Sequence, residues 1–256
     1  MKITAAIITY NEESNIRDAI QSVEWADEVL VVDSESTDRT CEIAEEMGAR
    51  VISKPWPGFS TQKQFATDQA ANDWIFSLDA DERVSPELRQ EIAVIAAAGP
   101  NADGYSIPRL SFYMGKPIRH SGWYPDYVTR LYPRERASYG EERVHEKLHY
   151  SGEMREEKLT GDLLHYTYRD LNHYLVKSAH YAQAWSQQRY EKGKKASLLQ
   201  AFIHGVGCFV KMYLVRAGFL DGRQGLLLAL LSAHSTFVKY ADLWVRYQPA
   251  KEEKQR

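Results

Sequence analysis

The sequence predicts an α/β fold, in which a mixed, mainly parallel sheet is flanked by helices and followed by a helical C-terminal segment. Over residues 1–100, apolar runs of strand length alternate with stretches of helical periodicity. From 101 to 168 this alternation gives way to short pieces rich in Tyr, Arg and His, and from 169 to 256 the pattern is helical and basic. We therefore expect a sheet domain over 1–168, in two halves, and a helical region over 169–256.

The first strand, helix and second strand are predicted within the first 33 residues. Residues 3–9 form an apolar run of strand length, and the polar residues 11–14 after it are suited to capping a helix. Apolar residues within 16–23 then recur at helical spacing. A second buried-strand run over 29–32 ends in Asp33.

The second helix and third strand follow. Ser36 or Asp38 can cap a helix whose apolar residues lie within 43–47, and Gly48 is suited to ending it. Val51 then begins the third strand.

Two more helices and a fourth strand complete the first half. We expect a polar helix over 59–71 and a strand over 74–78 that ends in Asp79. The helix over 85–98 begins with Ser-Pro-Glu and is followed by Gly-Pro at 99–100, a strong start and stop. Strands that alternate with helices in this way predict a parallel sheet.

Polar residues follow three of these strands, at 9–12, 33–36 and 79–82. Ligands of open parallel sheets bind beyond the carboxyl ends of the strands, so we expect these residues to converge on one edge. Asp79 and Asp81 are one residue apart, and two such carboxylates can hold a hard divalent cation that also binds a diphosphate. This pattern alone is common in surface turns, and the preceding strand and the neighbouring strand ends are what favour a metal site.

Composition limits the class of protein and its compartment. A content of 44% hydrophobic and 26% charged residues is typical of a folded chain. Cys41 and Cys208 are far apart and lack metal-ligand spacing, which argues against a disulfide framework and a zinc site. The N-terminal apolar run is short and stops at Asn11, unlike a secretory signal, so we expect a cytoplasmic protein.

The charge is distributed unevenly along the chain. Residues 192–256 hold 11 Lys and Arg against four Asp and Glu, so this segment carries +7 and the rest −10. The basic residues are interleaved with apolar stretches at 198–215 and 226–238, which favours the anionic face of a bilayer over nucleic acid as the partner. Neither stretch clearly spans a bilayer. We expect peripheral helices in the plane of the inner face of the cytoplasmic membrane; the alternative is that they pack on the sheet domain.

Three motifs carry a resemblance to a known family: Ile7–Glu12, Val31–Asp38 and Ser77–Glu82 resemble the family-2 inverting glycosyltransferases of the GT-A (Rossmann-like) fold. Pieces at 113–116, 120–126, 130–132, 144–146 and 163–166 are similar to the lipopolysaccharide-core glucosyltransferase subgroup. The resemblance implies that residues 1–100 bind a nucleotide sugar and 101–168 the acceptor. It also implies transfer of glucose from UDP-glucose, with Mg²⁺ or Mn²⁺, to a membrane-linked saccharide such as a lipopolysaccharide inner core.

The resemblance implies roles for individual residues near the nucleotide. Those expected to contact the donor or metal are Thr9, Tyr10 (stacked near the base), Asn11, Glu12 (nucleoside), Asp33 (base), Lys63, Asp79 (ribose or metal-bound water) and Asp81 (Mg²⁺ or Mn²⁺). For Lys63, an ordinary solvent-facing position on a helix is equally compatible with the sequence.

Inversion requires a base that deprotonates the acceptor hydroxyl. Many family members supply it from a Glu-Asp pair, which this chain lacks. Glu146 is the first candidate and Asp126 the second; a surface ion pair of Glu146 with Arg143 or Lys147 is the alternative.

The remaining candidates each have an ordinary structural alternative. His165 is a metal ligand or a core residue; Arg119 and Arg130 bind phosphate or an acidic acceptor, or are solvated; Trp123 and Tyr124 form an acceptor platform or pack in a core; His145 orients Glu146 or contacts a phosphate. Two other functions stay open: transfer to a polyprenyl-phosphate sugar or capsule precursor, and a catalytically silent membrane-bound scaffold or nucleotide sensor.

Overall fold

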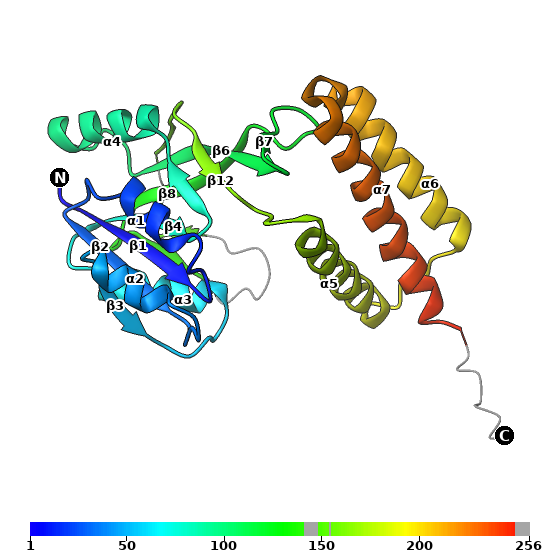
Figure 1. Cartoon of the computed structure of the whole chain (residues 1–256), viewed down its shortest axis with the longest axis horizontal. Helices are drawn as coiled ribbons and strands as arrows, with labels where there is room; N and C mark the ends of the chain where they lie inside the picture. The colour runs from blue at the N-terminus through cyan, green and yellow to red at the C-terminus, as the bar shows by residue number, and fades with distance from the viewer. Residues whose placement is uncertain (141–147, 154, 249–256) are drawn as a thin grey trace. The chain divides into compact units, whose positions relative to one another are not determined.

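The computed structural model describes residues 1–140, 148–153 and 155–248, which form two compact units. The first unit contains residues 1–110 and 125–166, and the second contains 111–124 with the chain from 167 onward. Figure 1 shows the elements of each unit.

The first unit is built on a mixed sheet with the strand order β3-β2-β1-β4-β8-β6-β12-β5. Strands β1 to β4 are mutually parallel, whereas β8 runs antiparallel to both β4 and β6. A short pair, β9 and β10, lies outside this sheet. The strands are β1 (Ile3–Thr9), β2 (Glu28–Asp33), β3 (Arg50–Ser53), β4 (Trp74–Asp79), β5 (Glu82–Val84), β6 (Gly104–Tyr113), β7 (Lys116–Pro117), β8 (Asp126–Pro133), β9 (Ala137–Tyr139), β10 (Leu148–Tyr150), β11 (Glu156–Lys158) and β12 (Leu163–His165).

Helices cover both faces of this sheet. Successive residues of β1 alternate between two apolar clusters, because side chains of a strand point to opposite faces in turn. One cluster includes residues of α1 (Ile16–Ser22), α2 (Thr40–Glu46) and α4 (Pro86–Ala98), and the other includes residues of α3 (Phe59–Gln69). The α/β fold, with a mainly parallel sheet between helices, is therefore confirmed.

The predicted helix signals act as expected at α4. The Ser85 hydroxyl accepts a hydrogen bond from the Leu88 amide at 3.2 Å, and Pro86 follows as the first helical residue. Gly48, after α2, adopts a φ of 81°, a conformation that favours glycine. The four strands and four helices expected in the first 100 residues are all present, with ends shifted by a few residues.

The second unit is helical and includes a segment that the sequence placed in the first domain. Its helices are α5 (Leu171–Glu191), α6 (Leu198–Phe209), a π-helical continuation of α6 (Val210–Val215), a 3₁₀ turn (Gly218–Asp221) and α7 (Gly222–Val245). Tyr113 and Ile118 are buried in one cluster with Tyr174 of α5 and Leu228 of α7. This cluster explains why 111–124 belongs with the C-terminal helices.

One helix of this unit is long and apolar enough to cross a bilayer, judged by length and composition alone. It spans Leu198–Val215, and 11% of it is buried. Length and composition make this stretch a candidate span, and whether it crosses a bilayer or lies on it stays a prediction.

Candidate functional site

The polar ends of three parallel strands meet at one edge of the sheet. Thr9 lies opposite Asp33 in the β1–β2 register, and Ile8 lies opposite Asp79 in the β1–β4 register. The predicted convergence of these strand ends is therefore confirmed.

Asn11 joins the loops that follow β1 and β2. Its amide donates to the Ser36 hydroxyl at 2.7 Å, and its side-chain oxygen accepts from the Thr37 amide at 2.8 Å. Its φ of 52° lies in the left-handed region, which Asn tolerates better than most residues. The next amide, of Glu12, donates to the Thr40 hydroxyl at 2.8 Å. Asn11 thus shapes the edge where a nucleotide is expected, and direct contact with a nucleotide stays a prediction.

Asp33 and Thr9 present polar atoms at the same edge, but both are buried. Asp33 is 1% exposed and accepts hydrogen bonds from the amide and hydroxyl of Ser36. The Thr9 hydroxyl is buried and has no hydrogen-bond partner among the described residues. Tyr10, in contrast, is 57% exposed. The edge therefore combines an exposed ring, suited to stacking on a base, with an unsatisfied buried hydroxyl.

Asp79 lies between two cations. Its Oδ1 is 2.9 Å from Nζ of Lys63, and its Oδ2 is 2.7 Å from Nη2 of Arg130. Both cations are 5% exposed, so the solvent-facing alternatives for Lys63 and Arg130 are wrong. Burial alone would raise the pKa of Asp79, but the charges of Arg130 and Lys63 hold that pKa well below its usual range.

Glu82 extends this arrangement into a chain of alternating charges. It is fully buried, accepts from the Asp79 amide at 3.0 Å, and lies 2.6 Å from Nη2 of Arg130. Arg109 approaches the same Glu82 oxygen at 3.6 Å and donates to Asp126 Oδ2 from Nη2 at 2.6 Å and from Nε at 3.1 Å. We call Lys63, Asp79, Arg130, Glu82, Arg109 and Asp126 the ion cluster.

Arg83 fixes the turn that carries Asp81. It is 8% exposed, and its guanidinium donates to the carbonyls of Ala80 and Glu82 at 2.8 Å and of Asn15 at 2.7 Å. Burial lowers its pKa, and neighbouring acidic groups oppose that shift. The turn between β4 and β5 is thereby held to the start of α1.

Asp81 and His165 form the candidate metal site. Strand β12 pairs with β5 so that His165 lies opposite Glu82, which places His165 Nε2 3.3 Å from Asp81 Oδ2. The described residues contain no group of three His, Cys, Asp or Glu side chains placed to hold a metal. Mg²⁺ commonly takes one or two carboxylates together with substrate phosphates, so a two-residue site at this edge fits a cation shared with a diphosphate.

The other predicted residues are not brought together at this edge by the first unit. Arg119, Trp123 and Tyr124 belong to the second unit, where the Arg119 guanidinium lies 5.1 Å from the Tyr124 ring centroid and Trp123 packs edge-on to Tyr113. Glu146 and His145 lie outside the described residues. Asp126 is the candidate base that the structure describes, with a 46% exposed side chain.

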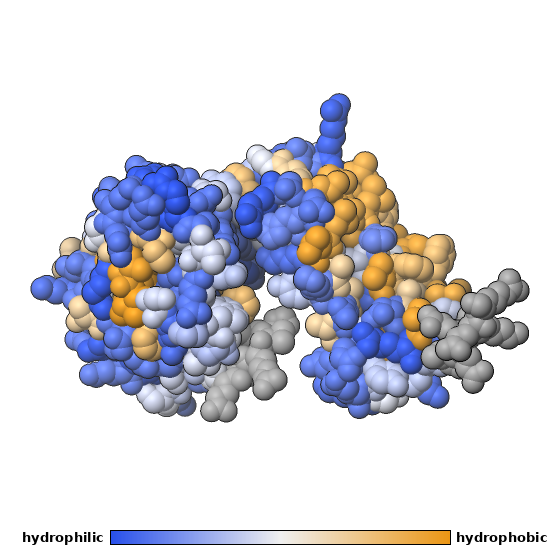
Figure 2. Space-filling model, turned by 60° about the horizontal axis from the view of Figure 1, so that its bottom comes forward, coloured by the Kyte–Doolittle hydropathy of each residue, from blue (hydrophilic) through white to orange (hydrophobic). Residues whose placement is uncertain are grey.

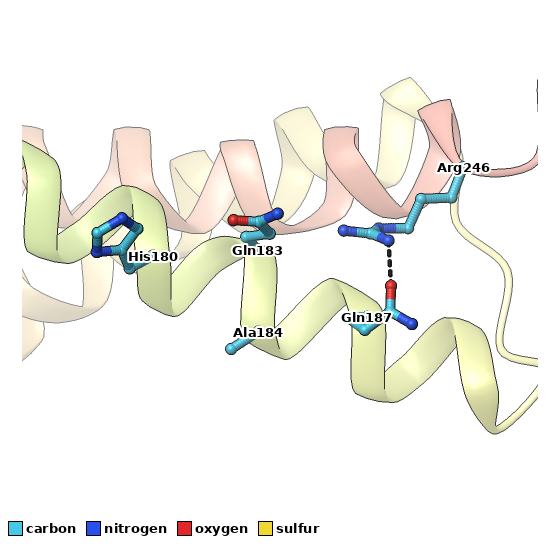
Figure 3. Close-up of a pocket in the computed structure, with 5 residues that line it drawn as sticks. All are labelled: His180, Gln183, Ala184, Gln187 and Arg246. Atoms are coloured by element: carbon cyan, nitrogen blue, oxygen red, sulfur yellow. Dashed lines mark hydrogen bonds between the residues drawn. The ribbon is translucent and has the colours of Figure 1, made fainter. Parts of the chain in front are cut away.

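A polar hollow of about 390 Å³ lies between α5 and α7 in the second unit (Figure 3). His180, Gln183, Ala184, Gln187 and Arg246 line it. Arg246 bonds to Gln187, Ser186 and Asp242, so its guanidinium already joins the two helices. We assign the hollow no catalytic role.

Sequence reasoning missed several residues that complete the site. Glu82 directly follows the two aspartates, but nothing in the pattern shows that it is buried. Arg109 lies on β6, where the helical and strand periodicities give no clear signal. Gln62 is fully buried on α3 and donates to the Ser34 hydroxyl at 3.1 Å.

Comparisons with known proteins identify the family of the chain. Residues 4–155 match the model of "Glycosyl transferase family 2". An uncharacterized glycosyltransferase of Rickettsia prowazekii is 34% identical over 94% of this chain and 86% of its own length. The lipopolysaccharide core biosynthesis glycosyltransferase LpsC of Rhizobium meliloti is 28% identical over 96% and 93%. Among solved structures, S. aureus TarS 1–349 in complex with UDP is 15% identical over 96% of this chain and 91% of that one, with a TM-score of 0.49.

Proposed function

The chain belongs to glycosyl transferase family 2 and is a glycosyltransferase, and we propose that it moves a hexose with inversion from a UDP-sugar, UDP-glucose first among them, to a membrane-linked saccharide. The observation that carries the proposal is the pair of aspartates at the carboxyl edge, where Lys63 and Arg130 hold Asp79 in its ionised form. Asp81 is two residues along the same turn.

The strand ends provide the binding groups for the nucleotide. Tyr10 is exposed and stacks on the base, and the unpartnered hydroxyl of Thr9 hydrogen-bonds to the donor. Glu12 contacts the nucleoside. The amide and the hydroxyl of Ser36 already donate to the carboxylate of Asp33. Asp33 therefore binds the base only through the lone pairs that Ser36 leaves free.

Asp81 and His165 would hold Mg²⁺ or Mn²⁺ beside the diphosphate. Such a cation, when bound, offsets the negative charge that develops on the departing diphosphate. The chain's own contribution is positional: Arg83 fixes the turn, and the β5–β12 pairing brings His165 to Asp81.

A carboxylate must remove the proton of the acceptor hydroxyl as the glycosidic bond forms. Glu146 remains our first candidate, and Asp126 the second. Arg109 directs two N–H groups at Oδ2 of Asp126, which fixes the orientation of that carboxylate.

The acceptor is proposed to be a glycolipid of the lipopolysaccharide inner core, at the inner face of the cytoplasmic membrane. The name of the LpsC relative supports this acceptor, and the similarity spans nearly the whole chain. Arg119 is the phosphate candidate, whereas Arg130 is occupied by Asp79 and Glu82. Trp123 with Tyr124 is the proposed sugar platform. A polyprenyl-phosphate sugar is the alternative acceptor.

A donor assay tests the proposal. Release of UDP from UDP-glucose, with Mn²⁺ and a membrane extract as acceptor, is compared between wild type, Asp81→Ala and the control Asp73→Ala. Asp73 precedes β4 at the other end of the strand and its side chain is 77% exposed. We expect Asp81→Ala to lose at least 100-fold in rate and Asp73→Ala to retain the wild-type rate.

The alternative of a silent nucleotide-binding scaffold gives a different result in the same assay. Such a protein binds UDP with Mn²⁺ in a calorimetric titration but releases none from any donor or acceptor mixture. That outcome would exclude the transferase assignment for this chain.

A further inference from the structure

The second unit exposes an extended apolar surface on α6 and its π-helical continuation. Leu199, Phe202, Ile203, Val206 and Val210 recur at intervals of three and four, which places them on one face of the helix. Their exposed fractions run from 40% for Val210 to 68% for Leu199. Figure 2 shows hydrophobic residues gathered on the helical unit.

Helix α7 continues this surface. It packs along α6 through small residues, because Ala201 and Ala229 are fully buried and Gly205 faces the Ala233 carbonyl. Leu226 and Leu230 on α7 remain 38% and 51% exposed. We call the following exposed apolar residues of the two helices and the turn between them the apolar face; Val245, at the far end of α7, is not included: Leu198, Leu199, Phe202, Ile203, Val206, Val210, Leu214, Val215, Phe219, Leu220, Leu226, Leu230 and Phe237.

The exposed charges of the stretch 192–248, which carries the apolar face, have one sign. Residues 192–248 contain two acidic residues, Asp221 and Asp242, and both are bonded inside the unit, to His120 and to Arg246. The exposed charged side chains of this stretch are all cationic: Lys192, Lys194, Lys195, Lys211, Arg216 and Arg223. An apolar surface bordered by exposed cations is complementary to an anionic bilayer.

The packing of α5 decides between lying on the bilayer and crossing it. The ring centroids of Trp185 and Tyr240 lie 4.8 Å apart and those of Tyr190 and Tyr247 lie 4.9 Å apart, both pairs tilted. Tyr174 is buried in one cluster with Leu228 near the start of α7. Helix α5 therefore runs along the length of α7. If α7 crossed the bilayer, α5 would have to cross it too. It exposes Gln183, Gln187, Gln188, Arg189 and Glu191, which hydrocarbon would not accommodate.

The turn between α6 and α7 exposes Phe219 and Leu220 but is also bonded to polar groups of the segment 111–124. Lys116 Nζ donates to the Asp221 carbonyl at 2.8 Å, and His120 Nδ1 lies 2.9 Å from Asp221 Oδ1. The Ser121 amide donates to the Arg216 carbonyl at 2.9 Å. Insertion of this turn into hydrocarbon would bury these groups, so tip-first insertion of the hairpin is disfavoured.

We propose that the apolar face is a monotopic membrane-binding surface, on which α6 and α7 lie in the plane of an anionic bilayer and α5 stays on the water side. The proposal names the lipid partner of the proposed function and rests on that function only for the identity of the acceptor. Although α6 with its continuation has the length of a span, the helix lies flat.

Vesicle flotation in the absence of donor and metal tests the surface. We expect wild type to float with phosphatidylglycerol-containing vesicles and much less with pure phosphatidylcholine. The double variant Leu199→Ser/Phe202→Ser should lose at least tenfold in partitioning. The control Leu175→Ser/Val176→Ser changes two apolar residues of α5, 38% and 47% exposed, and should bind as wild type.

The charge contribution has its own variant. Lys194→Glu/Lys195→Glu should weaken binding to the anionic vesicles roughly 30-fold or more and reduce its dependence on salt. Circular dichroism of each variant checks that the helices are retained. Equal flotation of wild type, Leu199→Ser/Phe202→Ser and Lys194→Glu/Lys195→Glu would overturn the proposal. A lipid-free dimer that does not bind vesicles would also overturn it.

Depth measurements separate a flat helix from a crossing one. Nitroxide labels are attached to single cysteines at positions 199, 203, 206 and 210, in a Cys41→Ser/Cys208→Ser background. A flat helix gives similar, shallow depths at all four positions, roughly 5–10 Å. Depths that pass steadily from one interface toward the bilayer centre would show that α6 spans, and would refute the in-plane arrangement. Because neither experiment uses donor, a negative result leaves the transferase assignment standing.

Discussion

Nη2 of Arg130 lies 2.7 Å from Oδ2 of Asp79 and 2.6 Å from Oε1 of Glu82, so one buried guanidinium nitrogen joins two carboxylates on either side of the Asp81 turn. Burial would lower the pKa of Arg130, but Asp79 and Glu82 raise it well above its usual value. The ionised forms of Asp79 and Arg130 therefore stabilise each other, and the first two predictions below start from that dependence.

Replacement of Arg130 should destabilise the first unit strongly. Arg130→Met leaves the buried carboxylate of Glu82 and the partly buried carboxylate of Asp79 without their shared partner. Loss of one partner of a buried ion pair typically costs about 3–5 kcal/mol of unfolding free energy. Arg89→Met is the matched control, because Arg89 is 51% exposed and only 3.5 Å from Glu24, a surface pair worth at most about 1 kcal/mol. Urea unfolding followed by circular dichroism compares the two. Equal midpoints would show that the ion cluster contributes little.

The Asp79 pKa predicts the pH range in which its ion pairs stabilise the fold. Its folded pKa lies below the ordinary value of 3.8, so the stabilisation is fully present above that value and is lost as pH falls through the lower folded pKa. The difference in unfolding free energy between wild type and Asp79→Asn should be constant from about pH 7 to pH 5 and shrink only below about pH 4. Denaturant titrations at several pH values check this, and a difference already shrinking near pH 6 would contradict the assignment.

Loss of His165 should weaken metal binding more than donor binding. His165→Ala removes one of the two proposed protein ligands, and we expect the affinity for Mn²⁺ in the presence of UDP to fall roughly tenfold or more. His149→Ala, at the exposed position of β10, serves as the control. Electron paramagnetic resonance of free Mn²⁺ measures the Mn²⁺ affinity of both variants. Unchanged Mn²⁺ affinity in His165→Ala would remove His165 from the site.

A bulky residue at Gly205 should disrupt the α6–α7 packing. A Cβ at this position would lie 3.2 Å from the Ala233 carbonyl oxygen and 3.3 Å from Phe237 Cβ, whereas a Cβ at Gly207 meets nothing within 4 Å. Gly205→Leu is expected to lower the stability of the helical unit by about 1–3 kcal/mol, and Gly207→Leu to leave it unchanged or raise it slightly. Thermal unfolding compares the melting temperatures of the two variants, and equal values would argue against close packing at Gly205.

The sequence predicts the first half of the fold well because its signals are local. Apolar runs, the Ser85 cap and Gly48 each act within one element, and the parallel topology then brings Asp33 and Asp79 to one edge. The strands between 104 and 165 carry no comparable local pattern: β12 is three residues long and is defined by its pairing with β5. Their positions depend on long-range contacts.

The candidate site shows the same division between residues that local sequence signals predict and residues that depend on long-range contacts. Asp79 and Asp81 could be proposed from spacing, but the partners of Asp79 come from α3 and β8, 16 and 51 residues away along the chain. Nothing local to Lys63 distinguishes it from a solvent-facing helix residue, and only the packing of α3 on the sheet shows that it is buried. The sequence likewise predicts 111–124 as part of the sheet domain, because the aromatic partners of Tyr113 in this segment follow residue 167.

The ion cluster has a consequence for how the donor enters. Its six side chains carry three positive and three negative formal charges, so the cluster is neutral as a whole and offers a diphosphate little net attraction at long range. Asp81 adds a negative charge at the point where the diphosphate is expected. Metal and nucleotide should therefore behave as thermodynamically linked ligands, each raising the affinity for the other by the same factor.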